Sequence, residues 1–190
     1  MNTIAFTGPR PKSLCGYDID AYKYFVDNLS AWLKNTYCKE PIRFITGGAQ
    51  GFDQLAFWAA NRAKFENPSI PVKNEIYVPF RGQETAWEKD GLFGQNNYKD
   101  MLKAADNVLY LKNELQDKHL IVKALFERNH TMIDNADALI ALYPDDSWRT
   151  KKNSGTAEAM RYALKCKKPI QQITFTTEKM LKPTNIITIR

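Results

Sequence analysis

The chain has 190 residues, 44% hydrophobic and 25% charged, which is the composition of a globular domain with a sizeable core. No apolar run approaches the ~20 residues of a membrane span, and the opening MNTIAFTG lacks the basic and apolar regions of a secretory signal. The net charge of +6 permits attraction to phosphates, but the lysines are dispersed and form no long basic tract. We therefore expect a cytoplasmic protein with no membrane partner.

The cysteines predict neither a disulfide framework nor a metal site. Cys15, Cys38 and Cys166 are scattered, and no C-x-x-C pair occurs. Only His119 and His130 could complete a zinc site, and the wide spacing of these residues along the chain argues against such a site. We expect free thiols in a reducing compartment and no bound metal.

Short runs rich in β-forming residues alternate with longer runs of helical period. The runs predicted as strands are 2–7, 42–46, 75–80, 107–111, 138–143 and 169–174, with 185–190 as a further edge strand. The runs predicted as helices lie within 18–37 and at 53–65, 95–105, 119–135 and 155–166. In the first helix, Asp18 or Asp20 can act as the cap.

This strict alternation of strand and helix predicts an α/β fold, with a mostly parallel sheet and helices on both faces. The sequence contains no internal repeat, no low-complexity segment and no linker, so we expect a single domain over residues 1–190. In such sheets, ligands bind beyond the carboxyl ends of the strands, where the strand order reverses.

Four segments rich in glycine or polar residues follow predicted strands. They are FTGPRP (6–11), TGGAQGFD (46–53), VPFRGQETAW (78–87) and NSGTAEA (153–159). Each alone is a weak signal. All four converge at one end of the predicted sheet, which indicates a binding site there.

The segment at 46–53 contains Gly47, Gly48 and Gly51 in a strand-to-helix turn. It is neither a P-loop nor a G-x-G-x-x-G motif. The glycines are explained by a tight turn, or by a phosphate or ribose that approaches bare backbone N–H groups. Asp53 has two interpretations as well: it caps the following helix or accepts hydrogen bonds from ribose hydroxyls.

Ser154, Gly155 and Thr156 open another predicted helix, either as a plain helix cap or as a second anion site. Arg10 follows directly after Gly8-Pro9, where it could bind a phosphate or carboxylate bidentately or form a surface salt bridge.

Arg128 and Met132 share one face of a predicted helix. Arg128 could reach the ligand, whereas Met132 is better explained as core. Phe80 and Trp87 flank Gln83 and could stack on a base, although burial explains them too. The short basic clusters 149–152 and 165–168 are interpreted as solvated surface, with a ligand role left open.

The segments AFTGPRP, TGGAQGFD, VPFRGQETAW, ERNHTMIDNAD and SGTAEA occur, over residues 4–163, in the order found in the YpsA-like branch of the SLOG superfamily, which includes the Smf/DprA and LOG groups. This resemblance implies a Rossmann-like sheet and a nucleotide-derived ligand at the glycine turns. The candidate ligand-binding residues are Gly8, Arg10, Gly47, Gly48, Ala49, Gly51, Asp53, Pro79, Phe80, Gln83, Trp87, Arg128, Ser154, Gly155 and Thr156.

The LOG enzymes cleave the N-glycosidic bond of nucleoside monophosphates with a Pro-Gly-Gly-x-Gly-Thr-x-x-Glu motif and an arginine on the preceding helix. Here Arg128 matches the arginine, but Ala159 stands at the glutamate position and Glu158 lies one residue early. One residue turns a helical side chain by about 100°, so Glu158 is only a weak catalytic candidate.

We therefore expect a binding protein for a nucleotide-derived small molecule, NAD-like, ADP-ribose-like or a cyclic signalling nucleotide, which it senses or sequesters. The first alternative is an N-glycosidase of the LOG type, and the second is a DprA-like nucleic-acid binder. Because no aromatic-basic interleaving occurs, we expect nucleic acid not to be a partner. The family resemblance also favours a homodimer or higher homo-oligomer, and no cofactor is predicted apart from the nucleotide-type ligand.

Overall fold

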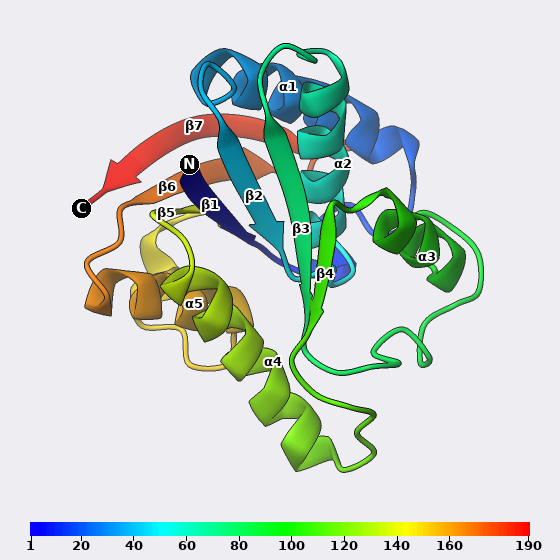
Figure 1. Ribbon diagram of the computed structural model, residues 1–190. Coiled ribbons are helices and arrows are strands. Elements are labelled where there is room, and N and C mark those ends of the chain that lie inside the picture. The colour runs from blue at the N-terminus through cyan, green and yellow to red at the C-terminus, as the bar shows by residue number, and fades with distance from the viewer.

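A seven-stranded sheet lies at the centre of the computed structural model, which describes residues 1–190 (Figure 1). Its strand order is β4-β3-β2-β1-β5-β6-β7. All neighbours pair in parallel except β6 and β7, which are antiparallel. The strands are β1 (Asn2–Thr7), β2 (Ile42–Thr46), β3 (Val72–Val78), β4 (Asn107–Tyr110), β5 (Ala138–Leu142), β6 (Ile170–Thr176) and β7 (Lys182–Ile189).

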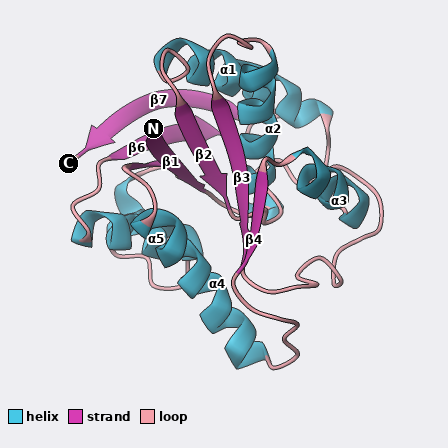
Figure 2. Cartoon of the chain, in the orientation of Figure 1, coloured by secondary structure: helices cyan, strands magenta, loops and turns pink.

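Helices cover both faces of the sheet (Figure 2). The α-helices are α1 (Asp20–Thr36), α2 (Phe52–Phe65), α3 (Gln95–Ala104), α4 (Lys118–Asp134) and α5 (Gly155–Lys165), with short 3₁₀ helices η1 (Pro11–Ser13) and η2 (Asp146–Arg149). Ile4 and Phe6 of β1 pack in the apolar cluster with α1 and α2, whereas Ala5 packs with α4 and α5. This alternation follows from the pleat of a strand that is buried on both sides. None of the helices is both long and apolar enough to span a membrane.

The prediction of an α/β fold with a mostly parallel sheet and helices on both faces is confirmed. The element boundaries differ in places. Strand β3 begins at Val72, three residues earlier than the predicted 75. It ends at Val78, before Pro79, because proline has no N–H to donate to the ladder. Helix α1 begins at Asp20, and the Asp18 carboxylate accepts a hydrogen bond from the Asp20 N–H at 2.9 Å.

The strand order reverses at β1. The chain leaves β1 toward β2, β3 and β4 on one side, and β5, β6 and β7 extend the sheet on the other side. The loop after β1 and the loop after β5 therefore diverge, which leaves a crevice beyond Thr7 and Leu142. The fold itself thus specifies where a ligand site is expected.

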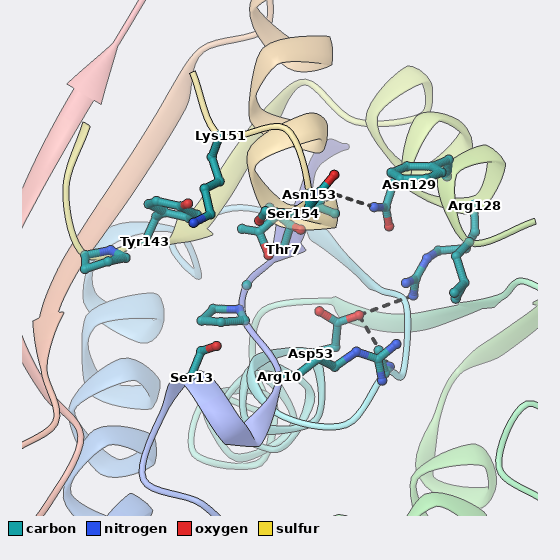
Figure 3. Close-up of a pocket in the computed structure, with 18 of the residues that line it drawn as sticks. Thr7, Arg10, Ser13, Asp53, Arg128, Asn129, Tyr143, Lys151, Asn153 and Ser154 are labelled. Carbon is teal, nitrogen blue, oxygen red and sulfur yellow. Dashed lines mark hydrogen bonds and ion pairs between the residues drawn. The ribbon is translucent and has the colours of Figure 1, made fainter. Parts of the chain in front are cut away.

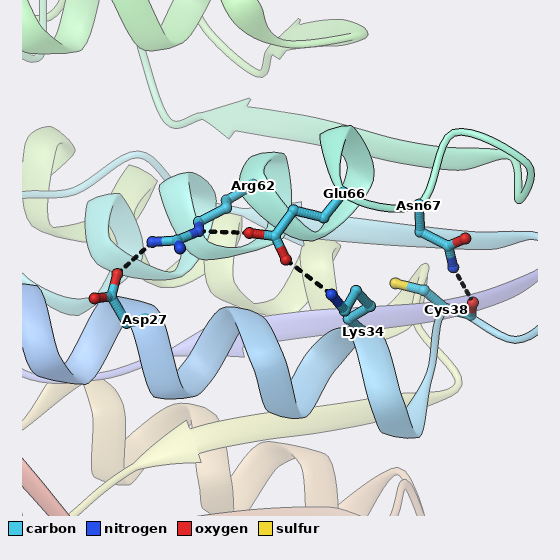
Figure 4. A network of polar contacts seen from close by, with 6 residues as sticks. All are labelled: Asp27, Lys34, Cys38, Arg62, Glu66 and Asn67. Carbon is cyan, nitrogen blue, oxygen red and sulfur yellow. Dashed lines mark hydrogen bonds and ion pairs between the residues drawn. The ribbon is translucent and has the colours of Figure 1, made fainter.

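A chain of exposed polar contacts joins α1 to α2 (Figure 4). Arg62 forms ion pairs with Asp27 of α1 and with Glu66, and Lys34 bonds Glu66 at 3.0 Å. Hydrogen bonds from Arg62 and Lys34 lower the pKa of Glu66. Because these groups are solvent-exposed, they add little to stability, and apolar burial beneath them is the larger contribution.

We predict that Phe52→Ala destabilises the fold by about 3–5 kcal/mol. Phe52 is fully buried, with ring centroids 6.2 Å from Phe6 and 6.1 Å from Phe25. The matched control is Phe65→Ala on the same helix, whose side chain is 74% exposed and whose loss should change stability by less than about 0.5 kcal/mol. Urea unfolding measures both, and similar losses for the two variants would contradict this description of the core.

Candidate functional site

A pocket of about 610 Å³ occupies the crevice beyond β1 and β5. Most of its walls come from three parts of the chain. The end of β1 and the loop after it contribute Thr7, Gly8, Pro9, Arg10 and Ser13. Helix α4 contributes Val122, Leu125, Phe126, Arg128 and Asn129. The segment from the end of β5 to the start of α5 contributes Tyr143, Pro144, Ser147, Lys151 and Asn153 to Thr156. Ala49, Asp53 and Phe175 complete the lining.

A buried ion pair lies at one end of the pocket (Figure 3). The Arg128 guanidinium donates from Nη1 to Oδ2 of Asp53 at 3.2 Å, and both side chains are more than nine-tenths buried. Asp53 Oδ2 also accepts from the Ala49 N–H at 3.4 Å. Arg10, an exposed residue, lies near the same carboxylate, and its positive charge acts on it. The pocket lining contains Arg10, Arg128 and Lys151 against the single carboxylate of Asp53, so the site retains an excess of positive charge.

Arg128 keeps an unused hydrogen-bond donor inside the protein. Its Nε is buried and has no hydrogen-bond partner. A buried donor without a partner typically costs about 1–3 kcal/mol, so its presence calls for an explanation. Arg128 also lines the pocket, so its positive charge lies beside any anion that enters it.

Gly47 makes room for the arginine. A Cβ atom on Gly47 would lie 1.1 Å from Arg128 Nη1 and 2.0 Å from Cζ. Gly51 has a φ of +94°, and a Cβ there would lie 2.4 Å from the carbonyl oxygen of Pro9. Gly47 is therefore required by the close approach of Arg128, and Gly51 is required by the close approach of the loop after β1.

The environment of Asp53 opposes its charge. Burial raises the pKa of the Asp53 carboxyl, while the charges of Arg128 and Arg10 and the N–H groups of Ala49 and Gly47 counteract that rise. Burial likewise lowers the pKa of Arg128, and the Asp53 charge opposes this shift. The ionised carboxylate therefore depends on the two arginines, and loss of either would favour its protonation.

The N-terminus of α5 forms another side of the pocket. The Ser154 Oγ accepts from the Ala157 N–H at 3.2 Å, so Ser154 is the cap that the sequence allowed. Gly155 and Thr156 line the pocket, and their N–H groups precede the intrahelical hydrogen bonds of α5. Together with the positive end of the helix dipole, they favour an anion at this position.

Hydrogen bonds hold the wall between β5 and α5 in place. Gln172 of β6 is fully buried and donates from Nε2 to the carbonyl oxygens of Tyr143 (3.2 Å) and Asp145 (2.9 Å). Its Oε1 accepts from Nε1 of the fully buried Trp148 at 3.1 Å. Arg161 donates to the carbonyls of Trp148 (2.6 Å) and Lys151 (2.8 Å). These hydrogen bonds hold the wall in place without a ligand, so this part of the pocket is preformed.

The structure brings about half of the candidate residues together. Gly8, Arg10, Ala49, Asp53, Arg128, Ser154, Gly155 and Thr156 line the pocket. Gly47 and Gly51 lie behind it for the steric reasons given above. Asp53 is the second residue of α2 and bonds the glycine turn, so it is not the cap of its own helix.

Gly48, Pro79, Phe80, Gln83 and Trp87 do not line the pocket. Three of these surround Tyr98. Gln83 Nε2 donates to the Tyr98 hydroxyl at 2.7 Å, the Trp87 ring packs edge-on against Tyr98 at 5.2 Å, and a Cβ on Gly48 would lie 2.9 Å from Tyr98 Cε2. These contacts give Gln83 and Gly48 a packing role around the buried Tyr98. Phe80 and Trp87 lie outside the pocket lining, so the pocket gives no support for stacking of a base on them.

Glu158 faces away from the pocket. Its Oε1 lies 2.6 Å from Nε2 of His130, whose ring stacks on Tyr162 with centroids 3.7 Å apart. Ala159, at the position of the LOG glutamate, is buried in the cluster between α5 and the sheet. Asp53 is thus the single carboxylate in the pocket lining, and no group of three or more His, Cys, Asp or Glu side chains is placed to hold a metal ion.

Several lining residues were not predicted. Tyr143 and Pro144 follow β5 directly, so the rule about strand ends could have found them. Val122, Leu125 and Phe126 lie within two turns of Arg128 on the same helix, and helical spacing could have flagged them. Ser147 and Phe175 carry no signal in the sequence, because only the tertiary fold brings them to the pocket.

The fold and the position of the pocket define a Rossmann-like α/β protein with a cavity at its switch point. The chain belongs to the YpsA family, described as the YspA SLOG family, whose model matches residues 4–178. It is 34% identical over 149 residues to the uncharacterized SPbeta prophage-derived protein YoqJ of Bacillus subtilis (strain 168), covering 73% of this chain and 80% of that protein. The resemblance stated from the sequence is confirmed.

Among solved structures, the chain resembles DNA processing protein A from Helicobacter pylori, whose structure describes a single-stranded DNA binding mode. The TM-score is 0.51 at 19% sequence identity, over 89% of this chain. The match spans 63% of the length of that protein, and at this identity the likeness concerns the fold.

This comparison corrects one expectation. Nucleic acid was excluded as a partner because the sequence lacks a long basic tract and interleaved aromatic residues. That exclusion is wrong, since a protein of similar fold binds single-stranded DNA. The exclusion used only linear basic and aromatic patterns, and such patterns do not show cations that the fold brings together from separate segments, such as Arg10, Arg128 and Lys151.

We predict that Gly47→Ala breaks the Arg128–Asp53 pair and destabilises the protein by about 3–5 kcal/mol, the usual cost of leaving a buried charge unpaired. The control is Gly155→Ala, whose added Cβ meets no atom closer than 3.9 Å and which should leave stability nearly unchanged. Urea unfolding at neutral pH compares the two. Equal stability of both variants would show that Arg128 does not depend on the space above Gly47.

Proposed function

We propose that this protein binds a nucleotide-derived small molecule, NAD-like, ADP-ribose-like or a cyclic signalling nucleotide, through its phosphate in the pocket beyond β1 and β5, and that it senses or sequesters this ligand. The observation that carries the proposal is Arg128: it lines the pocket, is 5% exposed and has a buried Nε without a partner. Burying a guanidinium is costly, so its place at a pocket argues for an anionic ligand.

The charge of the pocket supports a phosphate. Arg10, Arg128 and Lys151 line it, against the single carboxylate of Asp53. The N-terminus of α5 adds two backbone donors at Gly155 and Thr156. A volume of about 610 Å³ is within the usual range for sites that hold nucleotide-sized ligands.

Binding is favoured over cleavage by the position of the acids. General acid–base chemistry needs a carboxyl group within hydrogen-bond reach of the scissile bond. Asp53 is already bonded to Arg128 and to the Ala49 N–H, and Glu158 is paired with His130 outside the pocket. These contacts leave no unengaged carboxylate beside a bound nucleotide, which argues against N-glycosidic hydrolysis of the LOG type.

A second candidate function is binding of single-stranded nucleic acid. The likeness to the single-stranded DNA-binding protein favours it, and so does the net charge of +6. The same pocket could take one backbone phosphate of a strand, with further phosphates on exposed cations outside it. The two functions differ in salt dependence, because an oligonucleotide that contacts several phosphates releases several counterions and a mononucleotide does not.

We predict that Arg128→Lys and Arg10→Lys each weaken AMP binding roughly tenfold or more, because an ammonium group cannot reproduce the planar guanidinium fork. Arg62→Lys, on the far α1–α2 surface, is the control and should bind AMP as the unaltered protein does. Isothermal titration calorimetry measures all three. Titration with oligodeoxythymidylate at two salt concentrations tests the second candidate: a steep loss of affinity with salt, with no AMP binding, would replace the small-molecule proposal by the nucleic-acid one.

A further inference from the structure

One side of α4 presents apolar side chains to the pocket that the core does not use. Val122, Leu125 and Phe126 all line the pocket, and none of them belongs to the three buried apolar clusters of the protein. Val122 is 50% exposed, and Leu125 and Phe126 are only partly buried. Packing in the apolar core therefore does not explain why Val122, Leu125 and Phe126 are apolar.

The spacing of these residues gives them a common direction. Positions 122, 125 and 126 follow the i, i+3, i+4 pattern, and Asn129 continues it at i+7, so all four side chains lie on one face of α4. The amide of Asn129 donates to the Gly155 carbonyl at 3.4 Å, which connects this face to the start of α5. The apolar face is thus continuous with the wall that carries the free backbone donors.

The cationic end of the pocket adjoins this apolar face. Arg128 lies on α4 three residues beyond Leu125, about one turn along the helix, and reaches Asp53 (Figure 3). A ligand that fills both parts of the pocket consequently needs an anionic group and an apolar group. Inorganic phosphate meets the first requirement only, whereas a nucleotide meets both.

We propose that Phe126, flanked by Leu125 and Val122, is the surface on which the nucleobase of the ligand packs; this rests on the proposed function and specifies it. An aromatic ring accepts the face of any base by stacking, and branched aliphatic side chains extend the apolar contact. Phe126 is therefore a residue that selects nucleotides over simpler phosphates, and Arg128 binds the anion that both kinds of ligand share.

The test compares AMP with ribose 5-phosphate, which keeps the sugar phosphate and lacks the base. Phe126→Ala is expected to weaken AMP binding about tenfold and to leave ribose 5-phosphate binding unchanged. Phe126→Trp should retain AMP binding, because the indole ring also stacks. Phe65→Ala, a truncation of the same size at an exposed site on α2, should change neither affinity.

The outcomes separate the two proposals. If the unaltered protein binds neither AMP nor ribose 5-phosphate, the proposed function fails and the base surface with it. If AMP binds and Phe126→Ala weakens both ligands equally or neither, only the base surface is overturned. Mass photometry or sedimentation of the same variants checks the competing occupant: dissociation of a dimer by Phe126→Ala, with unchanged AMP affinity, would assign this face to a second copy of the chain.

Discussion

The arrangement of the pocket depends on one buried interaction, the pair between Arg128 and Asp53 above Gly47. Arg128 comes from α4 on one face of the sheet, and Asp53 comes from the first turn of α2 on the other face. The pair therefore joins the two layers of helices at the switch point. Because a side chain on Gly47 would occupy the position of the guanidinium, the glycine, the acid and the arginine act together.

This constraint explains features that otherwise look unrelated. The glycine turn is close-packed against the arginine and the β1 loop, so its shape is fixed before a ligand binds. The opposite wall is held by Gln172, Trp148 and Arg161. Preorganised walls lower the cost of ordering the site on binding, which fits a protein that recognises a small, charged molecule.

The sequence was a good guide where backbone pattern determines structure. Alternating strands and helices specified the sheet, and the rule about strand ends placed Arg10, Asp53 and the 154–156 segment at one edge. The structural role of Gly47 was harder to predict, because a sequence does not show that the Arg128 side chain occupies the space beside it. The segment 79–87 followed a strand in the same way, yet Gln83 and Trp87 pack around Tyr98. The glycine turn lines or supports the pocket and the segment 79–87 does not, and this difference depends on which residues the fold brings close, not on the local motif.

The comparisons establish the family and the fold, and the residues of the pocket suggest what it holds. The family model and the similarity to YoqJ place this chain in the YpsA family, and DNA processing protein A shares its fold. The proposal that a nucleotide is recognised without cleavage rests on the engaged carboxylates, the cationic residues of the pocket and the apolar face of α4.

The most direct test is an NMR titration of the ¹⁵N-labelled protein with AMP, which reports both binding and its location. If AMP binds in this pocket, the amide signals of Ala49, Gly155 and Thr156 and the Arg128 Nε–H signal should shift saturably, because these residues line it. Shifts confined to other regions, such as the amino ends of the strands near Asn2 and Asp137, or no shifts at millimolar AMP, would contradict it.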